Sequence, residues 1–170
     1  RLLALHATNA LLDFTPAGVA ARPAAPGFMD LMGSQFVAHP PMGRFTVDVA
    51  DSGHSLTAGI APFETLDELY LADMRAPVRV LLEARFTGAA PGFTRSDWPD
   101  ETPRPILYVH SVGAGEIAYF NLGHARGHYD APHRTPYWPH LERGSWDTPV
   151  FREILARGIA WAARVDERAA

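Results

Sequence analysis

Two histidines and an aspartate follow a run of apolar and aromatic residues in the segment YFNLGHARGHYD, residues 119–130. The apolar run predicts a buried strand, so the polar residues would lie where that strand ends. His124 and His128 are four positions apart, a spacing that puts two metal ligands on one face of a helix. Gly123 and Gly127 disfavour a helix here. A metal site, a catalytic histidine and an ordinary loop therefore all remain open for this segment.

Another histidine ends a second apolar run. Residues 2–6, LLALH, are continuously apolar up to His6, as in a strand that is covered on both faces. In an open α/β sheet, ligands bind outside the carboxyl ends of the strands, so two parallel strands would bring His6 and His124 within about 10 Å on one rim. His128 and Asp130 would then lie on the loop beyond. The alternative is that each histidine is structural and bonded to a nearby carbonyl.

His110 is a poor candidate for a shared metal site. The turn Gly-Ala-Gly at 113–115 predicts a hairpin in which His110 lies opposite Ala118. His124 would then be roughly 20 Å further along the second strand, at ~3.3 Å per residue. One ion cannot bridge that separation, so a metal bound jointly by His110 and His124 is disfavoured.

Neighbouring carboxylates occur at Asp67 and Glu68, with Tyr70 close behind. On a strand, adjacent side chains point to opposite faces, so the two carboxylates cannot act directly as a joint acid/base pair. We expect one of them to face the site and the other to face water. A solvated turn is the alternative.

The tryptophans at 98, 138 and 146 fall in segments that are predicted to be loops. The longest of these segments, Gly88–Pro105, is long enough to form part of a site rim. A loop tryptophan can stack on the apolar face of a sugar, or it can attach the loop to the body of the protein. Both interpretations stay open.

The composition excludes several classes of function. The chain has 170 residues, 47% hydrophobic and 20% charged, as expected for one globular domain. The net charge of −4 and the lack of a basic run argue against nucleic-acid binding. No apolar stretch approaches the ~20 residues that span a bilayer. The absence of Cys and Lys excludes thiol and Schiff-base chemistry, and no G-x-S-x-G motif supports a serine nucleophile.

Strand and helix signals are mixed along the chain, which predicts an α/β fold. Alternating strands are expected at residues 44–50 and 78–86, the hairpin at 106–122, and short helices at 7–14 and around 29–32. A short strand is expected at 69–71 and a loop at 15–27, while Leu2–His6 is expected to be central. The closing helix should begin after Thr148, with Pro149 first. Its core residues are expected to be Ile154, Leu155, Ile159 and Trp161, with Gly158 allowing close approach.

Several segments in order resemble the trehalose-utilisation (ThuA-like) family, and together they cover almost all of the chain. They are LLALHATNA, MGSQFVAHP, FTVDVADSGHSLTAGI, FETLDELY, ILYVHSVGAGEIAYFNLGH and FREILARGIAWA. The resemblance implies the class I glutamine amidotransferase-like superfamily, with a flavodoxin-like, mostly parallel sheet flanked by helices. A C-terminal hairpin and closing helix would complete it. It also implies a single domain over 1–170 that lacks the first strand and helix of the family.

The resemblance further implies which superfamily positions the two strand-end histidines occupy. In the wider superfamily the nucleophilic cysteine follows a strand at a tight turn, where this chain has His6. The catalytic histidine follows a late strand, where this chain has His124. The glutamate two residues after that histidine is Arg126 here. Because the chain contains no thiol, we expect no ammonia release from glutamine.

The family is associated with the breakdown of trehalose and of 3-keto sugars made from it. The resemblance thus implies hydrolysis or elimination of a (3-keto-)disaccharide or glycoside, in which a base removes the proton on C2 and C1 loses its substituent. The predicted catalytic residues are His6, His124 and Asp67. The predicted substrate-binding residues are Glu68, Tyr70, Asn121, Trp98 and His128.

The cofactor is unknown, and a divalent metal stays open. The expected partner is a small sugar, without nucleic acid or membrane, while a homo-oligomer is left open. The compartment is undetermined, with the cytoplasm slightly favoured. The alternative function is a non-catalytic sugar-binding or ligand-binding domain that kept the amidotransferase-like fold and lost its chemistry.

Overall fold

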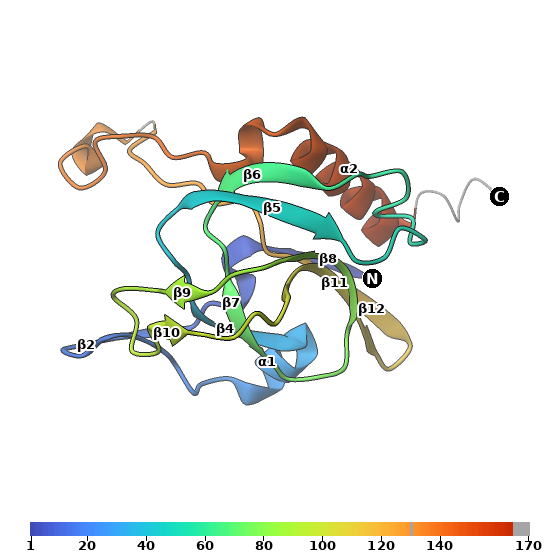
Figure 1. Ribbon diagram of the computed structural model, residues 1–170, viewed down its shortest axis with the longest axis horizontal. Coiled ribbons are helices and arrows are strands. Elements are labelled where there is room, and N and C mark those ends of the chain that lie inside the picture. Colours follow the sequence, from blue (N-terminus) through green and yellow to red (C-terminus); the bar gives the residue numbers. More distant parts are fainter. Residues whose placement is uncertain (130, 165–170) are drawn as a thin grey trace.

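The computed structural model describes residues 1–129 and 131–164, and a curled six-stranded sheet forms its centre (Figure 1). The order of the strands across the sheet is β1, β12, β11, β8, β5, β6. In that order they comprise Leu2–Leu5, Gly115–Phe120, Arg104–Val112, Arg79–Ala84, Gly43–Val49 and Phe63–Asp67.

Strands β1 and β12 are parallel, with Leu5 opposite Phe120, whereas the other pairs in this sheet are antiparallel. The α/β class is confirmed, but the mostly parallel arrangement holds for this pair alone. For β11 and β12 the short connection explains the difference, because a tight hairpin can join only antiparallel strands. The expected central place of Leu2–His6 is also wrong, since β1 lies at one edge of the described sheet. The hairpin register differs by one residue, because His110 lies opposite Ile117.

Three small ribbons extend the structure beyond the main sheet. They pair β2 (Leu12–Thr15) with β3 (Gly18–Ala21), β4 (Ser34–Ala38) with β7 (Leu71–Met74), and β9 (Gly88–Ala89) with β10 (Asp97–Trp98). The helix expected at 7–14 is instead a 3-10 turn, η1 (His6–Asn9), followed by β2. The loop expected at 15–27 contains β3, and the strand expected at 69–71 begins only at Leu71.

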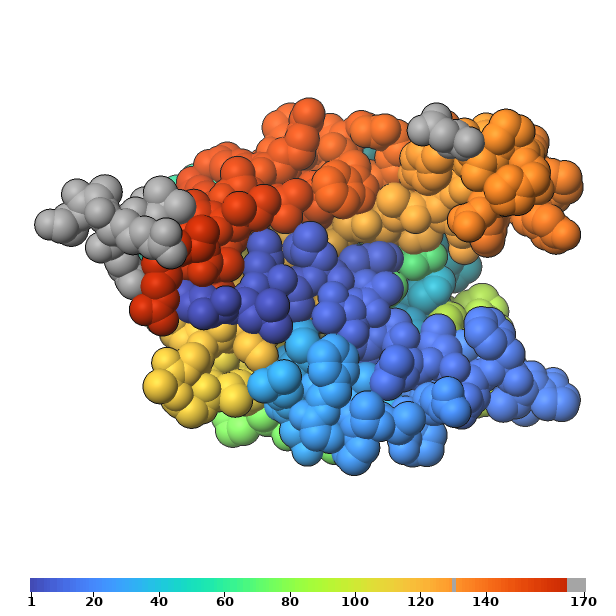
Figure 2. Space-filling model, turned by 180° about the vertical axis from the view of Figure 1, so that it is seen from behind, coloured from blue at the N-terminus to red at the C-terminus, as the bar shows by residue number. Residues whose placement is uncertain are grey.

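Both faces of β1 are covered, as its apolar run predicts. On one face Leu3 meets helix α2 (Pro149–Ala163), where a Cβ at Gly158 would lie 3.1 Å from the Leu3 methyl groups. On the other face, Ala4 packs in a cluster with Met32 of helix α1 (Pro26–Met32). Seen from behind, the N-terminal segment runs between α2 above and α1 below (Figure 2).

Helix α2 begins at Pro149 after Thr148, as predicted, although the Thr148 side chain makes no capping hydrogen bond. Its buried residues are Phe151, Ile154, Gly158 and Trp161. Leu155 is only partly buried, and Ile159 is 57% exposed, so the assignment of Ile159 to the core is wrong. The buried stripe is narrower than the apolar pattern because the four buried residues, spaced three or four positions apart, lie on one side of the helix. No helix among the described residues is long and apolar enough to cross a membrane.

The packing of α2 predicts different costs for two isoleucines on the same helix. Ile154 is 1% exposed, so Ile154→Ala should lower the free energy of unfolding by about 2–5 kcal/mol. Ile159→Ala removes an exposed side chain and should cost less than about 0.5 kcal/mol. Chemical denaturation of both variants measures this difference, and equal costs would contradict the observed orientation of α2.

Candidate functional site

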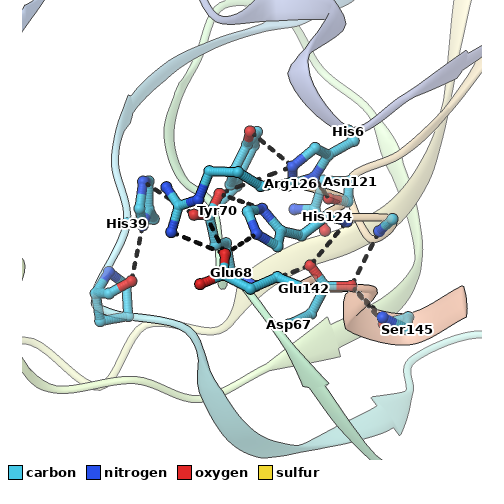
Figure 3. Close-up of polar contacts among 12 residues, drawn as sticks. His6, His39, Asp67, Glu68, Tyr70, Asn121, His124, Arg126, Glu142 and Ser145 are labelled. Atoms are coloured by element: carbon cyan, nitrogen blue, oxygen red, sulfur yellow. Dashed lines mark hydrogen bonds and ion pairs between the residues drawn. The ribbon is translucent and has the colours of Figure 1, made fainter. Parts of the chain in front are cut away.

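The parallel pair β1 and β12 delivers two histidines to one edge of the sheet. His6 directly follows β1 and His124 follows the end of β12, and their ring centroids are 5.7 Å apart at 74° (Figure 3). The prediction that these side chains share one rim is confirmed. His6 has a φ of +40°, in the left-handed region, so the chain turns sharply as the strand ends.

The His6 ring is held on both nitrogens. Its Nδ1 lies 2.9 Å from the backbone carbonyl of Asn121, and its Nε2 lies 3.1 Å from the hydroxyl of Tyr70. Because a carbonyl only accepts, Nδ1 carries the proton and Nε2 the lone pair. Burial lowers the pKa of His6, against the opposing effects of Asn121, Asp67 and Glu68, which favours this neutral form. Burial also raises the pKa of Tyr70, so its hydroxyl stays protonated.

His124 lies between two carboxylates. Its Nδ1 is 3.1 Å from Glu68 Oε2, and its Nε2 is 2.8 Å from Glu142 Oε2. Burial by itself would lower the pKa of His124, but the hydrogen bonds with Glu68 and Glu142 outweigh it and raise the pKa above the usual value. With both ring nitrogens bonded to carboxylates, the imidazole orientation is fully determined.

Glu142 is a site residue that sequence reasoning missed. It pairs with Arg126 through two backbone hydrogen bonds of 3.0 and 2.7 Å and through a side-chain ion pair of 2.8 Å. This isolated bridge folds the segment after His124 back over the histidine. The glutamate is far from His124 in the sequence and follows no recognisable pattern, so no local signal could have found it.

Glu68 stands at the centre of the cluster, and a third histidine approaches it from β4. Glu68 Oε2 is 3.8 Å from His6 Nε2, and Glu68 Oε1 is 3.7 Å from His39 Nε2. Burial would raise the pKa of Glu68, but the His124 hydrogen bond and the surrounding histidines lower it overall, which favours the carboxylate. His39 was also missed, although it follows a strand end, the signal that singled out His6.

Asp67, predicted to be catalytic, has a different environment. Its Oδ1 accepts from the backbone N–H groups of Glu68 and His124, at 2.8 and 3.2 Å. Its Oδ2 accepts from the N–H groups of Gly123 and Ser145 and from the Ser145 hydroxyl, at 3.0, 2.9 and 2.5 Å. The residue is completely buried. Both oxygens are therefore occupied in positioning the backbone around His124, and neither is available to a substrate.

A glycine permits this close approach. Gly144 begins the 3-10 turn η3 (Gly144–Asp147) and has a φ of +48°. A Cβ at this position would lie 2.6 Å from the carbonyl oxygen of His124 and 2.9 Å from Asp67 Oδ2. Any larger residue would push η3 away from the buried carboxylate.

The remaining predicted residues divide into those near the cluster and those away from it. Tyr70 and Asn121 both contact His6.

Trp98 is 2% exposed and belongs to the hydrophobic core, so its ring is not available to stack on a sugar. The signal was misleading because β9 and β10 fold this loop against the core. His128 lies on the loop beyond the cluster, and its Nδ1 is 3.0 Å from the carbonyl oxygen of Trp138. Asp130 lies outside the described residues.

The cluster fits a divalent metal ion. One nitrogen each of His6 and His124 and one oxygen of Glu68 all lie within 4.8 Å of one another. Ligands of a tetrahedral ion at about 2.1 Å are roughly 3.4 Å apart, between the 3.1 and 3.8 Å that separate Glu68 from the two histidines. The other imidazole nitrogens bond a carbonyl and a carboxylate, the arrangement that orients metal-binding histidines. His110 takes no part, since its Nδ1 lies near Pro77 O at 3.3 Å.

Comparisons with known proteins agree with this fold. The family model described as ThuA, trehalose utilisation, matches residues 15–144, and the chain belongs to this family. The match includes Glu68, His124 and Glu142, while His6 lies before it. A search of curated proteins finds no match.

Two solved structures are similar in fold. A ThuA-like protein from Parabacteroides merdae is 18% identical with a TM-score of 0.53, and the match covers 92% of this chain and 48% of that one. A ThuA-like protein from Bacteroides uniformis is 16% identical with a TM-score of 0.58, covering 94% and 56%. The chain therefore spans about half the length of these two proteins.

The environment of Asp67 predicts a large structural cost for removing its charge. Asp67→Asn replaces one accepting oxygen by an NH₂ group that faces buried N–H donors, so unfolding free energy should fall by about 2–4 kcal/mol. Glu64→Gln makes the same chemical change on the exposed side of the same strand and serves as the control. Urea denaturation of the two variants gives the comparison. An Asp67→Asn variant as stable as Glu64→Gln would contradict a positioning role for Asp67.

Proposed function

We propose that this protein is a carbohydrate-processing enzyme that cleaves a keto-glycoside at the cluster formed by His6, Glu68 and His124. The observation that carries the proposal is the convergence of these ligand atoms within 4.8 Å, at the carboxyl ends of the two parallel strands. Family membership supports a sugar as the substrate class. The 3-keto-disaccharide is the particular substrate that we propose.

The chemistry that suits this cluster is elimination next to a carbonyl. In a 3-keto sugar the proton on C2 is acidic, because its removal gives an enolate that extends to the oxygen on C3. As the C1–O bond breaks, its electron pair leaves with the oxygen and a C1=C2 double bond forms. Addition of water to that double bond completes a net hydrolysis.

His39 is the histidine that we assign as the base. Its Nδ1 lies 2.8 Å from the carbonyl of Pro40, so Nδ1 carries the proton and Nε2 presents a lone pair on the side of Glu68. The proton taken from C2 would reside on Nε2, where it can be returned to the departing oxygen. Tyr70 is neutral, and its O–H donates to His6 Nε2 in this structure. That hydroxyl would become available to the enolate oxygen when His6 Nε2 gives its lone pair to an ion.

His6, His124 and Glu68 would hold a divalent ion, which when bound would stabilise the negative charge of the enolate. The protein supplies the geometry for this role. The Asn121 carbonyl orients His6, and Glu142 with Arg126 orients His124. In this proposal Asp67 has no contact with the sugar. It acts by accepting hydrogen bonds from the backbone N–H groups of Glu68, Gly123, His124 and Ser145, which fixes the position of His124.

Turnover of 3-keto-trehalose, followed by release of glucose, tests the enzymatic proposal. His39→Ala should lower turnover by about 10²–10⁴-fold, as expected for loss of a general base. His124→Ala should abolish turnover, and it should also lower the melting temperature, because Glu68 and Glu142 lose the partner that they share. The control is His133→Ala, which removes an exposed histidine without an assigned role and should leave turnover unchanged. If the wild type binds the sugar without turnover, the protein is instead a sugar-binding domain.

Metal content is tested separately. Elemental analysis of the purified protein should find one divalent ion per chain, and Glu68→Gln should lose it while the His133→Ala control retains it. Removal of the ion with a chelator should also lower the melting temperature, because a ligand that binds only the folded state stabilises it. Equal ion content in Glu68→Gln and wild type would contradict a site at this cluster.

A further inference from the structure

The ion pair between Arg126 and Glu142 touches the histidine cluster and keeps polar groups without partners. Glu142 Oε2 lies 2.8 Å from His124 Nε2, and it also accepts a hydrogen bond from Arg126 Nε at 2.9 Å. The Nη2 group of Arg126 lies 2.8 Å from the same oxygen. All of these contacts fall on one oxygen of the carboxylate. Arg126 is therefore joined to His124 through a single shared atom.

The unused groups of this ion pair are accessible to solvent. A guanidinium carries five N–H donors, and the Glu142 contacts of Nε and Nη2 engage two of them on Arg126, so three remain. Glu142 Oε1 has no hydrogen bond to a described residue, and it is not one of the buried atoms that lack a partner. The side chain of Arg126 is 46% exposed and that of Glu142 is 29% exposed. The pair therefore offers both donors and an acceptor to a ligand.

The backbone around the pair holds it in place. Hydrogen bonds of 3.0 and 2.7 Å join the main chains of Arg126 and Glu142 in both directions. The Tyr129 hydroxyl donates to the Glu142 carbonyl at 3.1 Å. A Cβ at Gly127 would lie 2.6 Å from Leu141 Cδ2, so the two segments that carry the pair are closely packed. A ligand would meet groups whose positions are already fixed, which lowers the entropic cost of binding.

The pair lies beside the proposed ion site. His124 Nδ1 faces Glu68 at 3.1 Å, whereas Nε2 faces Glu142. The two nitrogens of an imidazole ring direct their bonds apart, so a group that binds Arg126 lies next to the reacting sugar. Figure 2 shows a hollow on the surface between the orange segment that follows His124 and the blue ribbon of β2 and β3. A substrate that extends from the cluster into this hollow would pass the ion pair.

The combination of donors and an acceptor selects the chemistry of the ligand. A hydroxyl group both donates and accepts, so neighbouring hydroxyls of a sugar can bond Arg126 and Glu142 Oε1 together. An anion would be repelled by the Glu142 carboxylate, and a cation would be repelled by the guanidinium. A neutral group with several hydroxyls suits both residues. The leaving sugar of a disaccharide is such a group.

We propose that Arg126 and Glu142 bind hydroxyl groups of the leaving sugar, and that they thereby select a disaccharide over a glycoside of a simple alcohol. This assignment deepens the proposed function and rests on it. Glu142 then has two roles, since Oε2 orients His124 and Oε1 contacts the sugar. Arg126 is a specificity-determining residue that binds the part of the substrate that does not react.

Two substrates with the same keto sugar and different leaving groups test the proposal. They are 3-keto-trehalose, which releases glucose, and methyl 3-keto-α-glucoside, which releases methanol. Arg126→Met should lower the ratio of their kcat/KM values, disaccharide over methyl glycoside, by about 10- to 100-fold, because charged hydrogen bonds to the leaving sugar are lost. Arg126→Lys keeps a positive charge beside Glu142 but lacks the planar fork of donors, and it should shift the ratio in the same direction.

The matched control is Arg143→Met. Arg143 also pairs with a single carboxylate through its Nε, and its side chain is 56% exposed, but its partner Asp147 does not contact the cluster. This variant should keep the wild-type ratio. Thermal melts and elemental analysis establish that the variants are folded and hold the same ion content as the wild type.

The outcomes separate this inference from the proposed function. Equal losses for the two substrates in Arg126→Met would show that Arg126 only orients His124, which overturns the inference and leaves the proposed function standing. A wild type that converts neither glycoside contradicts the proposed function. Calorimetric titration with trehalose, which has no keto group, then tests the sugar contact by itself. Weaker binding by Arg126→Met than by Arg143→Met supports that contact, and equal binding or none by the wild type overturns it.

Discussion

The buried carboxylate of Asp67 is the interaction on which the site depends. It gathers donors from the end of β6, from the Gly123–His124 segment and from the turn at Ser145, three parts of the chain that are far apart in the sequence. A completely buried charge is costly unless hydrogen bonds compensate it, and here five donors do so. The position of His124 therefore follows from satisfying one carboxylate.

A network of alternating carboxylate and histidine side chains extends outward from Asp67. Glu68, adjacent to Asp67, faces His6, His39 and His124, and Glu142 closes the far side of His124 with Arg126. Such a network is stable only when each member has its partner, so the segment after His124 must fold back for the cluster to exist. The hydrophobic packing of α2 against β1 holds the opposite end of the same strands in place.

The pattern of apolar and polar residues predicted several features correctly, because those features depend on residues that are close together in the sequence. The continuous apolar run of β1 indicated cover on both faces, Thr148 and Pro149 marked the start of α2, and two strand-end histidines indicated a shared rim. The pattern failed where contacts between distant segments decide the outcome. Ile159 is as apolar as Ile154 yet faces solvent, and Trp98 lies in the core because a small hairpin turns its loop inward.

The sequence by itself determined the family, the α/β class and the pairing of His6 with His124, since apolar strands that end in histidine need only a parallel neighbour to bring those residues together. It also excluded thiol and amine nucleophiles through the absence of Cys and Lys. Only the tertiary structure decided that Glu68 is the carboxylate at the cluster, that Asp67 serves the backbone, and that His39 and Glu142 join them. The reason is physical. Adjacent carboxylates are chemically alike in the sequence, and only the donors that surround each one in the fold make one structural and leave the other facing the histidines.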